Sequence, residues 1–140
     1  MKKAFRSIDE VFRALKKQKY ICDRRLATVI YLASEMGKPL LLEGEPGVGK
    51  TELAKALSKA LDRRLIRLQC YEGLDSNTAV YEWNYTKQIL RIKLAEAHQE
   101  GLDDLKNIFN EDYLIRRPLL EAIRSEADDK HACLLIDELD

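Results

Sequence analysis

The sequence predicts an α/β fold, a three-layer αβα sandwich in which helices cover both faces of a parallel sheet. Three short apolar runs have the composition of strands buried on both faces: Leu40–Glu43, Leu65–Gln69 and Ala132–Ile136. Amphipathic helical patterns separate these runs, and strands that alternate with helices are typical of a parallel sheet. A glycine-rich segment follows the first run directly, at the kind of strand end where such folds bind ligands.

The composition indicates one globular domain and excludes several classes of protein. The chain has 140 residues, of which 46% are hydrophobic and 34% are charged. Its 24 Lys and Arg residues balance 24 Asp and Glu residues, so nothing indicates a protein that acts mainly through DNA phosphates. The three cysteines lie far apart without a C-x-x-C pair, which argues against a zinc framework or a disulfide set. With neither an export signal nor a membrane-length apolar run in the sequence, we expect a cytoplasmic protein.

Two helices are expected before the first apolar run. Ser7 and Glu10 have the spacing of a capping box at the start of the first helix. Asp23 is a suitable N-cap for the second helix, and Gly37 is a suitable residue to end it.

Three further helices are expected between and after the apolar runs. An apolar stripe predicts a helix over Thr51–Leu61, and a weaker pattern predicts one over Gln88–Gln99. Pro118 suits the first position of a short helix. No structure is assigned to Tyr71–Tyr85, and the polar stretch Ser125–Lys130 is expected to be a loop.

The segment between the first run and the next helix matches G-x-x-x-x-G-K-[ST], the phosphate-binding loop. Its glycines can adopt positive φ, so the backbone N–H groups can form a cup that faces an anion. The helix that follows presents its positive dipole end to the same anion. The residues expected to contact the nucleotide are Gly44, Glu45, Pro46, Gly47, Val48, Gly49, Lys50, Thr51 and Glu52.

Two adjacent acids at the end of the last apolar run complete the predicted site. Asp137 and the hydroxyl of Thr51 are the expected Mg²⁺ ligands. Glu138 is the expected catalytic base for water, and Lys50 is expected to neutralise the β- and γ-phosphates during catalysis. The arginines around the second run, Arg63, Arg64 and Arg67, are expected to lie on a solvated face, with contact to phosphates or to an acidic neighbour as the alternative.

Beyond the two motifs, four longer stretches resemble the MoxR branch of AAA+ ATPases, and the likeness runs from about Ile8 to Asp140. These stretches are Pro39–Gly44, Leu68–Asp75, Val80–Tyr85 and Leu114–Leu120. The resemblance implies a P-loop NTPase fold, ATP and Mg²⁺ as cofactors, and ATP hydrolysis. It also implies a homo-oligomeric ring such as a hexamer, and a chaperone role in the maturation or activation of partner proteins, often with a von Willebrand factor A-domain protein.

The resemblance also implies how the chain is divided. Residues 1–38 are expected to be a helical lead-in and residues 39–140 a P-loop core as far as the acid pair, with about three core strands. Because AAA+ domains continue beyond this point, we expect the N-terminal portion of such a domain, with weak or no turnover. In the family's strand order another strand separates the strands that carry Leu41 and Leu135, so we expect a gap between them, with collapse into a direct pair as the alternative. The family places the adenine near Tyr20 and Ile21.

Two other functions are compatible with the motifs. One is a P-loop ATPase that acts on nucleic acid, similar to a clamp loader or helicase, which would bind single-stranded DNA in a salt-dependent way. The other is a P-loop kinase, which would consume ATP only with a hydroxyl acceptor. The adjacent acids Asp137 and Glu138 favour hydrolysis over the kinase, because a glutamate that activates water suits transfer to water.

Overall fold

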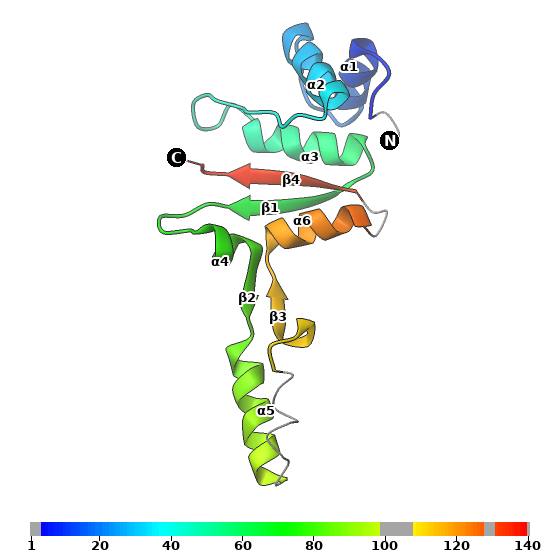
Figure 1. Ribbon diagram of the computed structural model, residues 1–140. Helices are drawn as coiled ribbons and strands as arrows, with labels where there is room; N and C mark the ends of the chain where they lie inside the picture. The colour runs from blue at the N-terminus through cyan, green and yellow to red at the C-terminus, as the bar shows by residue number, and fades with distance from the viewer. Residues whose placement is uncertain (1–3, 99–107, 128–130, 140) are drawn as a thin grey trace.

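The fold has two parallel strands between two helices. The computed structural model describes residues 4–98, 108–127 and 131–139. Strands β1 (Arg64–Gln69) and β4 (Ala132–Asp137) pair in parallel, with helix α3 (Lys50–Ala60) on one side and α6 (Pro118–Ala127) on the other (Figure 1). The predicted α/β class and the parallel pairing of these two runs are therefore confirmed.

The register of β1 and β4 aligns their carboxyl ends. Pairing runs without a break to Gln69 opposite Asp137, and the next amide, Cys70 N–H, donates to the Asp137 carbonyl at 2.8 Å. Ile66 and Leu68 of β1 are buried, so this pairing is supported by apolar packing as well as by hydrogen bonds. The side chains at the end of β1 are thus fixed next to those at the end of β4.

The prediction of a strand at Leu40–Glu43 is wrong. Residues 38–45 have no regular secondary structure, and residues 40–43 make no backbone hydrogen bond to another described residue. Leu41 is 71% exposed, whereas Leu40 and Leu42 pack partly against the helical core. A strand needs a hydrogen-bonding neighbour, and no described segment pairs with this run. The described sheet around the site therefore has two strands instead of three, and Leu41 does not pair directly with β4.

The first helix has the predicted start but a different capping contact. In α1 (Ile8–Lys17) the Ser7 hydroxyl accepts from the Glu10 amide at 3.2 Å, as a capping box requires. The Glu10 carboxylate, however, accepts from the amide of Arg6 at 2.6 Å and not from that of Ser7. The helix start is therefore stabilised one residue further upstream than the motif predicts.

The second helix has both of its predicted ends. In α2 (Arg24–Met36) the Asp23 carboxylate accepts from the Leu26 amide at 2.7 Å. The helix stops at Gly37, whose φ of 61° lies in the left-handed region that glycine adopts without a steric penalty.

One hydrophobic cluster holds α1, α2 and α3 together. Val11 and Leu15 of α1 are fully buried, and they meet Ile30 of α2 and Leu53 of α3 in this cluster. Tyr20 and Leu57 are partly buried against it. The helix that begins with Lys50 is thus anchored by its apolar face, which limits how far the loop before it can move.

An antiparallel arm extends from the sandwich on the side of α6. Helix α4 (Ser76–Val80) leads into β2 (Tyr81–Trp83), which pairs with β3 (Leu114–Arg116). Helix α5 (Tyr85–Ala97) lies at the far end of the arm, well away from α3 (Figure 1). A 3₁₀ turn (Glu111–Tyr113) precedes β3.

Two helix boundaries in this half of the chain differ from the prediction. Helix α5 starts three residues earlier than Gln88, because the Asn84 side chain accepts from the Lys87 amide and caps it. Helix α6 continues to Ala127, so the expected loop over Ser125–Lys130 does not begin at Ser125; residues 128–130 lie outside the described residues. The expected end of α5 at Gln99 also lies outside them. Among the described helices, none combines the length and the apolar character that crossing a membrane requires.

Candidate functional site

The loop between residue 43 and α3 turns at two glycines with positive φ. Gly47 and Gly49 have φ values of 84° and 94°, which side-chain-bearing residues rarely adopt. A β-carbon at Gly49 would lie 3.8 Å from a ring carbon of Tyr20, an ordinary contact, so backbone conformation and not space demands the glycine. The two glycines let the chain turn onto the N-terminus of α3, which begins at Lys50.

The Lys50 side chain, which follows the loop, contacts the backbone at the start of the loop. Its ammonium donates to the carbonyl oxygen of Gly44 and, at 2.9 Å, to that of Glu45. The loop therefore curls around the lysine, and the positive charge lies beside the backbone that precedes α3. Glu52, the third predicted site residue of α3, has a partner on its own helix. Its carboxylate pairs with Lys55 at 2.6 Å and is largely exposed.

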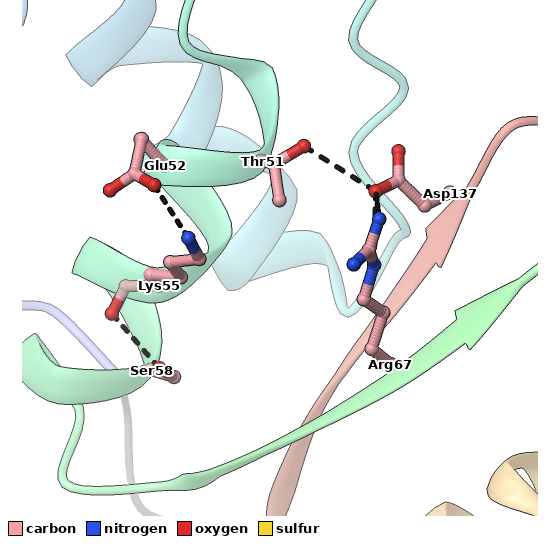
Figure 2. A network of polar contacts seen from close by, with 6 residues as sticks. All are labelled: Thr51, Glu52, Lys55, Ser58, Arg67 and Asp137. Carbon is pink, nitrogen blue, oxygen red and sulfur yellow. Dashed lines mark hydrogen bonds and ion pairs between the residues drawn. The ribbon is translucent and has the colours of Figure 1, made fainter.

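The first turn of α3 meets the end of β4. The Thr51 hydroxyl donates to Asp137 Oδ2 across 3.4 Å, a contact between residues 86 positions apart in the sequence (Figure 2). The structure thus brings together the two residues that the sequence predicts as metal ligands. A hydroxyl and a carboxylate are both oxygen ligands of the kind that Mg²⁺ takes, usually with several waters and substrate phosphates completing its shell. Among the described residues no group of three or more His, Cys, Asp or Glu side chains could hold a metal by itself.

Strand β1 contributes two side chains that contact the acid pair. Arg67 donates to Asp137 Oδ2 from Nη2 at 2.8 Å and from Nε at 3.2 Å (Figure 2). Gln69 donates from Nε2 to Glu138 Oε2 at 2.9 Å. Both carboxylates are therefore held by side chains of the neighbouring strand, at the aligned ends of the sheet.

The backbone at Glu138 is strained. Its φ of 58° is in the left-handed region, which costs a residue with a side chain on the order of 1 kcal/mol. Strained residues of this kind persist where their surroundings fix them, and the bond from Gln69 is such a constraint. The carboxylate of Glu138 is thus directed by both its own backbone and its neighbour.

Sequence reasoning did not identify Asp137 as the partner of Arg67. We expected Arg67 on a solvated face, and its side chain is indeed 48% exposed. Its guanidinium nevertheless forms an ion pair with the Asp137 carboxylate. Arg64 also has an acidic partner, Glu121 of α6. The strand register is the signal that could have identified Arg67 as a contact of Asp137. It places Asp137 opposite Gln69, and Gln69 lies on the same face of β1 as Arg67.

A hollow of about 240 Å³ lies beside the loop. It is lined by Phe12, Lys16, Lys19, Tyr20, Ile21 and Cys22. Tyr20 links this hollow to the loop, since its ring also faces Gly49. Burial raises the pKa of the Tyr20 hydroxyl, and the nearby Cys22 adds to this shift. Burial likewise raises the pKa of the Cys22 thiol, and Asp23 raises it further.

Residues 39–140 match a family model described as the AAA domain (dynein-related subfamily). The chain belongs to this AAA family. The matched range contains the glycine loop, both parallel strands and the arm.

The curated relatives of this AAA chain include Lon proteases. The chain is 40% identical over 68 residues to a Lon protease of Clostridium beijerinckii, and 41% identical over 68 residues to Lon protease 1 of Bacillus subtilis. Each match covers 49% of this chain and 9% of the relative. A Lon protease of Cytophaga hutchinsonii is 54% identical over 41 residues, or 29% of this chain and 5% of that protein. The chain thus spans less than a tenth of the length of the relatives that it matches. No solved structure matches it significantly.

Proposed function

We propose that this chain binds ATP with Mg²⁺ and hydrolyses it as part of a MoxR-like AAA+ ATPase. The observation that carries the proposal is the contact between the Thr51 hydroxyl and Asp137, which joins the end of the glycine loop to the end of β4. These are the two segments whose association the mechanism of a P-loop ATPase needs. Membership of the AAA family supports nucleotide binding in general.

Each residue of the loop has a role that follows from its chemistry. The amides of the loop and of the first turn of α3 can donate to phosphate oxygens, and the dipole of α3 favours negative charge at this end. Lys50 can exchange its two carbonyl partners for phosphate oxygens, which are stronger acceptors because they are charged. Thr51 and Asp137 would hold the metal, which supplies charge neutralisation between the phosphates.

Glu138 is suited to act as the base for the attacking water. It follows the metal-binding acid directly, and Gln69 fixes the direction of its carboxylate. A base must lie within hydrogen-bond reach of the proton that it takes, so this direction matters more than its basicity alone. We infer that the hollow formed by Tyr20 and Ile21 receives the adenine, because it adjoins the loop at Gly49 and has a largely apolar lining.

The finer assignment to the MoxR branch rests on the sequence. The four matching stretches include Leu68–Asp75, which contains the end of β1 and the residues after it, and Val80–Tyr85, which contains β2. We therefore propose a cytoplasmic, ring-forming chaperone whose partners include a von Willebrand factor A-domain protein. The Lon relatives are named as proteases, and their similarity to this chain extends over 68 residues. The equal numbers of acidic and basic residues lend no support to a nucleic-acid substrate.

The proposal is tested by measuring ATP affinity by calorimetry for Lys50→Ala and for a matched lysine of the same helix. Lys50→Ala is expected to weaken ATP binding at least about tenfold, since it removes a charge-assisted contact to phosphate. Lys55→Ala is the control, because the Lys55 ammonium pairs with Glu52 on the exposed side of α3. Equal affinities for the two variants would refute the assignment of the loop.

A further inference from the structure

One carboxylate oxygen of Asp137, Oδ2, accepts hydrogen bonds from three donor atoms on two elements of the fold. Thr51 Oγ1 approaches Oδ2 from α3, while Nε and Nη2 of Arg67 approach the same oxygen from β1 (Figure 2). The Asp137 side chain is 21% exposed and that of Arg67 is 48% exposed. The ion pair is therefore only partly screened by water, and the two groups interact more strongly than a fully exposed pair.

The Arg67 guanidinium lies where it would repel a metal ion bound to Asp137. A divalent metal bound between Thr51 and Asp137 would share Oδ2 with a positive group whose nitrogen is 2.8 Å from that oxygen. Like charges this close repel each other, and the carboxylate lone pairs used by Arg67 are lost to the metal. Arg67 and a metal at this site therefore compete for the same carboxylate oxygen.

We propose that Arg67 substitutes for the metal in the metal-free chain, and that it sets the Mg²⁺ concentration at which the nucleotide site becomes competent. It neutralises Asp137 and keeps the carboxylate turned toward Thr51 until Mg²⁺ displaces the guanidinium from Oδ2. Arg67 is thus a positioning residue and not a catalytic one. This inference rests on the proposed ATP site and deepens it by naming a residue that controls metal entry.

The same strand provides a matched control. Arg64 also lies on β1 and also pairs with an acid, but its partner is Glu121 of α6, at 2.5 Å. Its side chain is 71% exposed, and no hydrogen bond or ion pair joins it to Thr51, Asp137 or Glu138. Neutralising Arg64 removes one positive charge from β1 without freeing the metal-binding carboxylate.

The experiment measures the Mg²⁺ concentration that gives half-maximal binding of a non-hydrolysable ATP analogue to the full chain. Arg67→Gln is expected to lower this concentration about fivefold, the effect of one partly exposed ion pair. Arg67→Lys, which keeps the charge but loses the two-donor contact, is expected to lie between wild type and Arg67→Gln. Arg64→Gln is expected to match the wild type. Arg67→Lys keeps the test usable if Arg67→Gln does not fold.

A second readout separates competition from a merely structural role. Without metal, Arg67→Gln should melt at a lower temperature than the wild type, and Mg²⁺ with the analogue should restore more of its stability than it adds to the wild type. An unchanged or raised Mg²⁺ requirement in both Arg67 variants would overturn the inference while leaving the ATP site intact. A wild-type chain that binds the analogue equally with Mg²⁺ and with EDTA would overturn the proposed metal site itself.

Discussion

The helices around the glycine loop and the arm at the opposite end of the molecule are stabilised in different ways. Around the loop, Val11, Leu15 and Leu53 are almost completely buried in one cluster shared by three helices. At the end of the arm, Ile89 and Leu90 of α5 are each more than half exposed. Apolar burial is therefore concentrated behind the loop that carries the proposed chemistry.

The arm is held mainly by specific contacts. The rings of Trp83 and Phe109 meet edge to face with their centroids 5.5 Å apart. Gln88 is buried and donates to the carbonyl of Ile108 at 2.6 Å, and Arg117 pairs with Glu82 across the β2–β3 ribbon. The helices behind the loop are therefore held by buried apolar packing, whereas the end of the arm leaves large apolar side chains exposed.

The largest expected effect is the loss of the cluster behind the loop. Leu53→Ala removes a side chain that is 1% exposed, so we expect the free energy of unfolding to fall by about 2–5 kcal/mol. Urea unfolding followed by circular dichroism measures this value. A loss below about 1 kcal/mol would show that α3 is not anchored by this cluster.

A smaller effect is expected at the cap of α2, which supports the same cluster. Asp23→Ala removes the acceptor of the Leu26 amide and should reduce stability by about 1 kcal/mol. Asp23→Asn is the matched control, because asparagine caps equally well, and its stability should be close to that of the wild type. An equal loss in both variants would show that the charge of Asp23 matters rather than its capping bond.

The smallest effect is expected on the arm. Leu90→Ala changes a side chain that is 57% exposed, and we expect a stability change within about 0.5 kcal/mol and unaltered ATP affinity. A loss comparable to that of Leu53→Ala would contradict the contrast between the two regions. The same urea experiment compares the two variants directly.

The sequence predicts the regions whose structure depends on local signals. The caps at Ser7 and Asp23, the stop at Gly37 and the positive φ angles of Gly47 and Gly49 each need only a few neighbouring residues, and all occur where the sequence predicts them. The pairing of β1 with β4 also follows from apolar runs that are long enough to show a strand pattern.

The features that the sequence does not predict depend on distant partners. Strands β2 and β3 have three residues each, which is too short for a clear alternation, and they pair across more than 30 positions of the chain. The apolar run at Leu40–Glu43 resembles a strand but lacks a neighbour among the described residues. The role of Arg67 depends on the register of two strands, which no local pattern in the sequence encodes.

The most direct test of the account is the Mg²⁺ dependence of ATP affinity, because the central claim is that Thr51 and Asp137 form a metal site at the end of the loop. Calorimetry of the wild type in Mg²⁺ and in EDTA should show tighter binding with Mg²⁺, since a metal held by Thr51 and Asp137, whose side chains are in contact, would neutralise phosphate charge. Asp137→Asn keeps the shape of the side chain but removes its charge, so it should lose most of this gain while its affinity in EDTA is retained. The same gain from Mg²⁺ in Asp137→Asn as in the wild type would contradict the claim.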